Sequence, residues 1–300
     1  MTSIAVAAAN EPVAPIPLAI DLDRRKVALG DKLFHDPQLS RDGSISCASC
    51  HVLSLGGVDR RQQSIGIDGL KGDFNAPTIL NSVFNFRQFW DGRVETLEEQ
   101  IDGPVHDSRE MDSNWPEIAA KLKADRDYRQ QFRQIYARGI VPNSIRNAIA
   151  TYESSLITPN SRFDRFLRGD KKSLSITEKE GYQRFQDYGC ISCHQGVNLG
   201  GNMFQSFGIF GDYFADRGEI NKADLGRYNV TQKESDRYVF KVPSLRNIAR
   251  TSPYFHDGSV ESLAEAVKIM GRYQLGRSLK PNEIDKIVQF LNTLTGELPN

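Results

Sequence analysis

The amino-acid sequence predicts a mainly α-helical fold with long irregular loops, divided into two domains of similar size. Apolar residues recur at helical spacing in several segments, whereas the alternating pattern of a half-buried strand is scarce. The pentapeptide Cys-x-x-Cys-His also occurs twice, beginning at Cys47 and at Cys190, with a similar length of chain around each copy. A chain of 300 residues is long enough for two ordinary domains.

The predicted helices lie between the two pentapeptides and after the second one. Five segments carry apolar residues on one helical face: 115–136, 145–156, 177–188, 263–270 and 281–294. The last of them begins with a proline, which suits the first turn of a helix. Residues 161–175 are polar and predict a connection. The predicted domains are residues 21–165 and residues 166–300.

The two pentapeptides contain all four cysteines of the chain. They comprise Cys47, Cys50 and His51 in the first copy, and Cys190, Cys193 and His194 in the second. In c-type haem attachment, both thiols of such a motif bond to haem vinyl groups and the histidine becomes an axial iron ligand. A zinc site would need four ligands gathered together, and a thioredoxin-like pair would explain neither the second copy nor the histidines. The sequence therefore predicts two cytochrome c-like domains, each with a covalently bound haem c.

Charge and hydropathy argue against several other classes of protein. The 38 basic residues balance 38 acidic ones, so nothing indicates a nucleic-acid partner, and no apolar run is long enough to span a membrane. Residues 221–250 carry seven Lys/Arg against three Asp/Glu, which suits either an acidic protein partner or a solvated surface. No Lys or Arg precedes Arg24, so residues 1–20 lack the basic start of a secretion signal. Because haem is attached to such motifs outside the bacterial cytoplasm, we expect a periplasmic protein whose leader is absent from this sequence.

The second axial ligand of each iron separates electron transfer from catalysis, because an electron-transfer haem has both axial positions filled. The candidate ligands are Met111, Met203, Met270, His35, His106 and His256. Met203 follows His194 too closely to reach the opposite haem face. Met270 has enough intervening chain, but spacing alone leaves open whether it is a ligand or a core residue. Spacing does not choose among the histidines.

Longer motifs extend over nearly the whole chain. They are Leu33-Phe34-His35-Asp36-Pro37, Asn75-Ala76-Pro77-Thr78, Phe89-Trp90-Asp91-Gly92-Arg93, Gly103-Pro104-Val105, Glu110-Met111, Pro253-Tyr254-Phe255-His256-Asp257-Gly258 and Met270-Gly271-Arg272-Tyr273-Gln274-Leu275-Gly276. Together these motifs resemble those of the bacterial dihaem cytochrome c peroxidases, a family that includes the MauG-type enzymes. The resemblance implies a homodimeric enzyme that reduces hydrogen peroxide with electrons from a small c-type cytochrome or a cupredoxin.

The resemblance also implies roles for the haem ligands and for one aromatic residue. His51 would hold the peroxidatic haem of the N-terminal domain. His194 and Met270 would bind the iron of the high-potential, electron-transfer haem in the C-terminal domain. Trp90 would lie between the two haems as the electron bridge; from sequence alone it is equally a core aromatic.

The remaining implied residues belong to a peroxide pocket and a metal site. Gln100 would orient peroxide by hydrogen bonding. Glu110 would move a proton from the iron-bound oxygen to the leaving one, although from sequence alone it is equally an exposed acid. Asn75 and the backbone carbonyls of Thr251 and Pro253 would hold a calcium ion at the domain junction, because oxygen ligands suit that cation.

The loop after the first haem motif departs from the family pattern. Ile67 stands where many members have a histidine that caps the peroxidatic iron in the oxidised enzyme. An isoleucine cannot bind iron, so we expect this iron to be open without reductive activation, unless His106 or His35 caps it.

Two other functions are compatible with parts of the sequence. The missing histidine also suits a MauG-like enzyme that oxidises side chains of a partner protein. Such enzymes have tyrosine in place of the axial methionine, and here Met270 is retained with Tyr273 close by. A non-catalytic dihaem electron carrier would need both irons to be six-coordinate.

Overall fold

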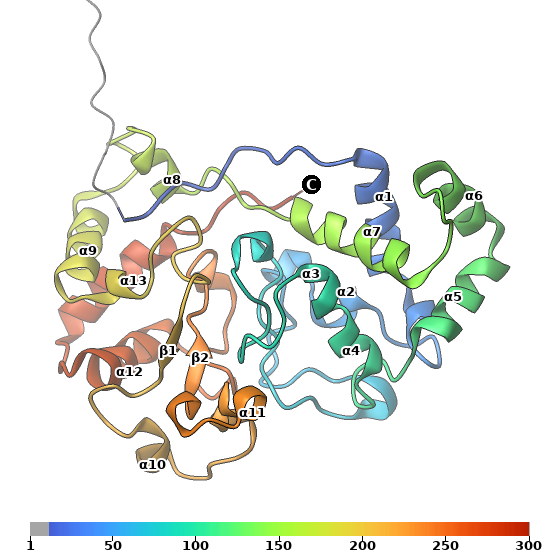
Figure 1. Ribbon diagram of the computed structural model, residues 1–300. Helices are drawn as coiled ribbons and strands as arrows, with labels where there is room; N and C mark the ends of the chain where they lie inside the picture. Colours follow the sequence, from blue (N-terminus) through green and yellow to red (C-terminus); the bar gives the residue numbers. More distant parts are fainter. Residues whose placement is uncertain (1–11, 300) are drawn as a thin grey trace, which may run out of the picture.

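The computed structural model describes residues 12–299, so most of residues 1–20, the segment without the basic start of a secretion signal, lies outside the described residues. The fold is mainly α-helical with long loops, as predicted, and has one two-stranded antiparallel sheet (Figure 1). Within the described range, no helix combines the length and apolar character that crossing a bilayer requires.

Short and medium helices make up most of the regular structure. The α-helices are α1 (Arg24–Phe34), α2 (Cys47–Cys50), α3 (Leu97–Gln100), α4 (Asp102–His106), α5 (Trp115–Ala124), α6 (Arg126–Ile135), α7 (Pro142–Ser155), α8 (Arg162–Leu167), α9 (Ile176–Asp187), α10 (Tyr213–Arg217), α11 (Tyr228–Thr231), α12 (Leu263–Leu275) and α13 (Pro281–Asn292). The strands are β1 (Phe204–Ser206) and β2 (Val239–Lys241).

Two predicted segments differ from the structure in ways that side-chain capping explains. The continuous helix predicted over residues 115–136 is wrong, because Asp125 interrupts it. The carboxylate of Asp125 accepts hydrogen bonds from the N–H groups of Asp127 (2.7 Å) and Tyr128 (3.1 Å) and so starts α6 as a new helix. The polar connection predicted over residues 161–175 contains α8, which begins at a reciprocal cap between Ser161 and Asp164.

The first half of the chain buries one hydrophobic cluster, to which α1 and α7 contribute side by side (Figure 1). Leu33, Phe34 and Ile149 are fully buried between these two helices. Gly30 permits this close packing, since a Cβ atom there would lie only 2.0 Å from the backbone oxygen of Ala148. The cluster reaches Cys47 and Ala48 of α2, and thus supports the first haem-attachment motif.

The second half buries a separate cluster between α9 and α13, with α12 packed against α13. Phe163, Tyr182 and Phe290 pack their rings edge to face or tilted at its centre. Strands β1 and β2 pair with Phe204 opposite Lys241. This sheet lies beside α12 in Figure 1, in the part of the second half that carries the cavity described below.

Each terminal segment packs on the half that is distant in sequence. Val13 belongs to the hydrophobic cluster of the second half, and the backbone oxygen of Ala14 accepts a hydrogen bond from Arg246 (2.9 Å). Leu298 packs against the cluster of the first half, and Figure 1 shows the C-terminal segment returning towards α7. The division at residues 165 and 166 stays a prediction; that position falls inside α8.

A buried polar network joins the two halves. Asn81 and Thr158 exchange two hydrogen bonds of 2.8 Å, and the side chain of Asn247 donates to the Thr158 hydroxyl at 2.9 Å. All three side chains are almost completely buried. Because buried polar groups are costly to leave unpaired, this network fixes how the halves meet.

Candidate active site

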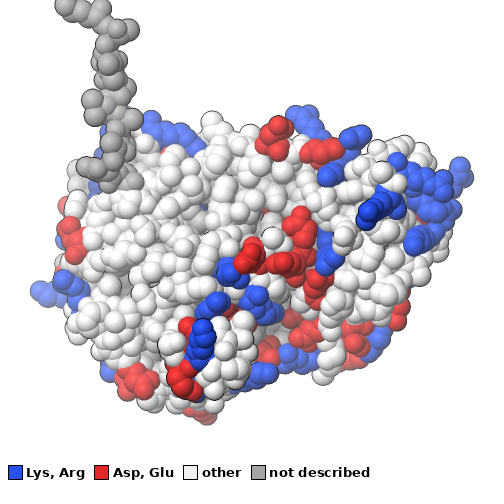
Figure 2. Space-filling view, viewed as in Figure 1, with Lys and Arg blue, Asp and Glu red and all other residues white. Residues whose placement is uncertain are grey.

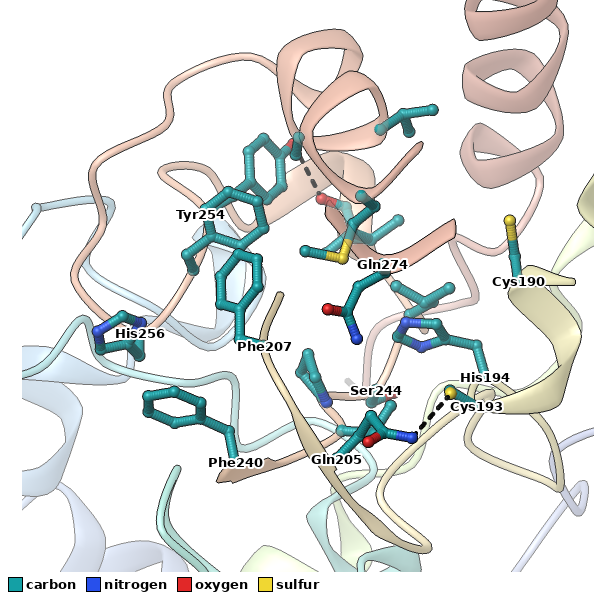
Figure 3. Close-up of a pocket in the computed structure, with 18 of the residues that line it drawn as sticks. Cys190, Cys193, His194, Gln205, Phe207, Phe240, Ser244, Tyr254, His256 and Gln274 are labelled. Atoms are coloured by element: carbon teal, nitrogen blue, oxygen red, sulfur yellow. Dashed lines mark hydrogen bonds between the residues drawn. The ribbon is translucent and has the colours of Figure 1, made fainter. Parts of the chain in front are cut away.

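A cavity of about 260 Å³ lies between the two halves and contains the second haem-attachment motif (Figure 3). Cys190, Cys193 and His194 line it together with Met270 of α12. Trp90, from the first half of the chain, also lines it. The structure therefore brings together the residues that the family resemblance assigned to the electron-transfer haem and to the electron bridge.

The two motif histidines have the same local geometry. Nδ1 of His51 donates to the backbone oxygen of Gly57, and Nδ1 of His194 donates to that of Leu199, both over 3.1 Å. Burial lowers the pKa of His51, and lowers that of His194 to about 4, so both rings are neutral near pH 7. A neutral ring anchored through Nδ1 leaves Nε2 free, as a haem-iron ligand requires. The four cysteines form no disulfide, so both motifs fit covalent haem c.

The other proposed axial ligands have different surroundings. Among the three methionines of the described chain, Met270 lines the cavity and Met111 is buried in the core of the first half. The hydroxyl of Tyr273 donates to Asp216 (2.8 Å), and Tyr273 lines a separate surface pocket. His256 does line the cavity, but its Nε2 pairs with the buried carboxylate of Asp224 at 2.7 Å.

Trp90 is held by backbone groups from both halves. Its indole Nε1–H donates to the backbone oxygen of Asn75 (2.9 Å). Its own backbone oxygen accepts a hydrogen bond from the N–H of Lys241 in β2 (2.8 Å). The ring lies edge-on to His256, with 6.4 Å between the ring centroids. These contacts fix the indole at the junction of the two halves.

Glu110 lies near the first haem-attachment motif, in a turn that folds back on α4. The backbone N–H of Met111, the next residue, donates to the oxygen of Pro104 (3.1 Å). Burial raises the pKa of the Glu110 carboxyl, and the negative charge of Asp107 raises it further. Burial raises the pKa of the thiols of Cys47 and Cys50 most; among the charges, Glu153 raises that of Cys47 and Asp59 that of Cys50, and Glu110 makes a smaller contribution to both. The interpretation of Glu110 as a freely exposed acid therefore does not hold.

Gln100 ends helix α3, next to the start of α4. Its side chain forms no hydrogen bond with any described residue, and it is partly buried. An amide in this condition has its donor and acceptor available for a small ligand.

The loop that carries Ile67 is fastened to the Glu110 segment. Ile67 is fully buried, and its N–H donates to the backbone oxygen of Glu110 (2.9 Å). Gly66 permits this approach, because a Cβ atom there would lie 2.1 Å from the backbone oxygen of Arg109. The ion pair between Asp68 and Arg41 (2.6 Å) holds the loop from its other side.

The two histidines that were considered as substitute caps are exposed and have other partners. His35 pairs with Asp31 across 3.0 Å. The ring of His106 lies edge-on to Trp115, with 6.3 Å between centroids. Neither side chain is buried beside the first haem-attachment motif.

Each of the three residues proposed to bind calcium has an oxygen atom that accepts no hydrogen bond from a described residue. The side-chain amide of Asn75 donates through Nδ2 to the backbone oxygen of Arg61 (2.8 Å), which leaves Oδ1 available. No described N–H group donates to the backbone oxygens of Thr251 and Pro253. All three residues line the same cavity. Oxygen atoms of this kind are the ligands that a hard cation prefers.

Two buried charged residues that form no ion pair with any described residue were not predicted from the sequence. Lys241 lies in β2 with 7% of its surface exposed, and Glu153 lies in α7 with 5% exposed. Burial raises the pKa of Glu153 to about 8, with a smaller contribution from Glu98. A lysine between Phe240 and Val242 in a buried strand was the available signal for Lys241. For Glu153, the available signal was an acidic residue among the apolar residues of the segment predicted as a helix over 145–156.

The basic residues counted in 221–250 do not all reach the surface. Lys241 and Arg246 are both buried, so they are not available to a docking partner. Figure 2 shows basic side chains gathered over α6 on the face in view, and acidic ones near α3. Part of the basic excess counted along the sequence is therefore not at the surface.

Comparisons with known proteins decide the family. Residues 24–172 match the family model described as di-haem cytochrome c peroxidase. The chain is 47% identical to the cytochrome c551 peroxidase of Nitrosomonas europaea over 300 residues, which cover 99% of this chain and 88% of that relative. The chain belongs to the dihaem cytochrome c peroxidase family. This membership implies two haem c groups.

Further relatives agree with membership in the dihaem cytochrome c peroxidase family. The chain is 51% identical over 288 residues to the cytochrome c peroxidase Ccp of Escherichia coli K12; this covers 96% of the chain but only 62% of that relative's length. A solved structure of a MauG-like protein associated with microbial copper homeostasis aligns with a TM-score of 0.84 and 28% identity, over 99% of this chain and 96% of that one. These likenesses support an oxidoreductase of the peroxidase type.

Proposed function

We propose that this protein reduces hydrogen peroxide to water at the haem attached to Cys47, Cys50 and His51, with electrons from a small c-type cytochrome or a cupredoxin. The observation that carries the proposal is the buried carboxyl of Glu110, which lies within electrostatic range of both cysteines of that motif. A periplasmic location is part of the proposal, because haem c is attached outside the bacterial cytoplasm.

The proposed reaction needs two electrons and two protons to convert one hydrogen peroxide molecule into two water molecules. When bound, the haems supply the stored electrons and the iron at which the peroxide O–O bond breaks. Glu110 accepts a proton from one peroxide oxygen and returns it to the other. Burial keeps its pKa above that of an exposed carboxyl, so the carboxylate accepts the peroxide proton more readily than an ordinary carboxylate would. Gln100 orients peroxide through its free amide.

Trp90 is the proposed connection between the two haem sites. Its indole lines the cavity that contains His194 and Met270, and it belongs to the half of the chain that carries His51. His194 and Met270 would supply the two axial ligands of the electron-transfer haem, an arrangement that raises the reduction potential.

The peroxidatic site is proposed to be open in the fully oxidised protein. Ile67 has no atom that can bind iron, and its loop is tied to Glu110 and Arg41. His35 and His106 are engaged elsewhere. Activation by reduction would therefore have no capping side chain to release.

We further propose a calcium ion at Asn75, Thr251 and Pro253, and a homodimer. The three unpartnered oxygens support the calcium site. The homodimer rests on the family resemblance alone. The MauG-like alternative is weakened by Tyr273, whose hydroxyl is engaged by Asp216 while Met270 lines the cavity.

The decisive experiment mixes fully oxidised protein with hydrogen peroxide and a reduced small c-type cytochrome, without pre-reduction. Immediate oxidation of the cytochrome is the expected result. Activity that appears only after one-electron reduction would overturn the open-site proposal but keep the peroxidase. No activity under either condition would overturn the peroxidase itself.

A further inference from the structure

Lys241 is a buried cation for which the described structure offers no counter-ion. The residue is 7% exposed, at the end of the fully buried strand β2. Its Nζ forms no ion pair or hydrogen bond with any described residue. The acid whose charge raises its pKa, Asp91, is paired with Arg93 across 3.0 Å. An ammonium group without a partner in such a place is strongly unfavourable.

The cavity beside Lys241 has an unusual charge composition. Its lining contains no Asp or Glu, and Lys241 is its only Lys or Arg. The remaining titratable groups there are thiols, Tyr254 and two histidines. His194 is the proposed iron ligand, and His256 is paired with Asp224. Lys241 is therefore the one cationic residue among those that line the cavity.

The haem implied for this cavity carries anionic groups that could pair with Lys241. Haem c has two propionate carboxylates, and Cys190, Cys193 and His194 line the same cavity as Lys241. A carboxylate that meets the ammonium group of Lys241 relieves two desolvation costs at once, that of the lysine and that of the propionate. Burial lowers the pKa of Lys241 to about 8, although the charge of Asp91 acts in the opposite direction.

We propose that Lys241 binds a propionate carboxylate of the haem attached to Cys190 and Cys193, and so positions that haem edge relative to Trp90. The link to Trp90 is direct, because the backbone N–H of Lys241 donates to the Trp90 oxygen over 2.8 Å. Pairing with Phe204 in the sheet fixes Lys241 from the other side. Lys241 is thus a positioning residue. The inference rests on the presence of this haem and not on peroxidase activity.

Neutralising a propionate also affects the iron. An unpaired carboxylate next to a haem favours the ferric state, which carries one more positive charge than the ferrous state. Lys241 therefore raises the reduction potential of the C-terminal haem. It adds to the effect of the Met270 ligand, which acts in the same direction.

The test is an equilibrium redox titration of the holoprotein, followed spectroscopically at each haem. Lys241→Met is expected to lower the potential of the C-terminal haem and to leave that of the N-terminal haem unchanged. Lys241→Arg keeps the charge and is expected to retain most of the potential. Lys268→Met is the matched control, because Lys268 lies on α12 near Met270 but is exposed and paired with Glu265. An unchanged potential in the Lys241→Met holoprotein would overturn the inference.

A second readout covers the case in which Lys241→Met does not assemble. The propionate bending band in the resonance Raman spectrum reports hydrogen bonding to that group. Replacing an ammonium by a guanidinium changes this bonding, so Lys241→Arg is expected to shift the band, and the control Lys268→Met is not. An unshifted band in Lys241→Arg would overturn the inference. Neither readout uses peroxide, so a failed peroxidase assay would leave both results interpretable.

Discussion

The indole N–H of Trp90 donates a hydrogen bond to the backbone oxygen of Asn75 over 2.9 Å. The backbone N–H of Asn75 in turn donates to the oxygen of His256 over 2.8 Å. Trp90 is therefore connected through one residue to the loop of the second half that also contains Thr251 and Pro253. The proposed electron bridge and the proposed calcium site share Asn75.

Replacing Trp90 by phenylalanine tests the bridge. Trp90→Phe keeps an aromatic ring but removes the indole N–H, so we expect slower electron transfer between the haems and a loss of stability of about 1 kcal/mol. Stopped-flow mixing of the half-reduced protein with peroxide measures the rate. Trp115→Phe is the control, because it removes a comparable hydrogen bond to Asp102 (2.7 Å) away from the cavity. Equal rates in the two variants would contradict the role of Trp90.

Removing calcium tests the metal site through the same contact. A chelator is expected to slow electron transfer between the haems, because Asn75 loses a partner and holds Trp90 less firmly. Added Ca²⁺ is expected to restore the rate. Mg²⁺ is not, because it requires a tighter octahedral geometry. Metal analysis that finds no calcium in protein prepared without a chelator would count against the site.

Glu110 is open to a direct kinetic test. Glu110→Gln keeps the size of the side chain but cannot carry a proton between oxygens, so we expect kcat/KM for peroxide to fall roughly 10²–10⁴-fold. The absorbance spectrum is expected to stay unchanged. A variant that retains nearly full activity would remove Glu110 from the mechanism.

The pH dependence provides a separate test of the same carboxyl. Because Glu110 must be ionised to accept a proton, activity should rise with pH through its pKa, which burial and Asp107 raise above 4.5. Asp107→Asn removes one of these two causes, so the rising limb of the pH profile is expected to move to lower pH. A limb that does not move would show that another group controls it.

Ile67→His tests the open-site proposal by adding a possible ligand. The variant is expected to show less high-spin ferric haem than the wild type and to require reduction before it turns over. Ile67→Leu is the control, since it fills similar volume without a ligand atom. If Ile67→His keeps the wild-type spectrum and immediate activity, the loop does not bring position 67 to the iron.

Glu153 makes stability depend on pH. Its folded-state pKa of about 8 exceeds the ordinary value of 4.5, so the protonated form is favoured on folding. This contribution to the free energy of unfolding is fully present below pH 4.5 and is lost as the pH rises through about 8. Glu153→Gln is expected to flatten that decline in urea denaturation, whereas Glu117→Gln, at an exposed position of α5, should leave it unchanged. An identical slope in Glu153→Gln would refute the assignment.

The sequence predicts those features that depend on local spacing. The two haem-attachment motifs and the helical faces of α7, α9 and α13 follow from residues close together in the chain. The break at Asp125 was missed because the apolar residues keep their helical spacing across it, whereas the capping carboxylate of Asp125 starts a new helix there. Lys241 and Glu153 were missed because burial of a charge is decided by distant segments. The loop around Ile67 combines the two cases. The absence of a histidine at position 67 can be read from the sequence, but the hydrogen bond from Ile67 to Glu110 depends on the tertiary fold.

The exchange of terminal segments has a consequence for biosynthesis. Val13 completes the core of the half that is translated last, while Leu298 packs on the core of the half that is translated first. The first half therefore gains its contact with Leu298 only after the second half has been synthesised, whereas Val13, which the second half needs, is made before either core. This exchange couples the folding of the two halves.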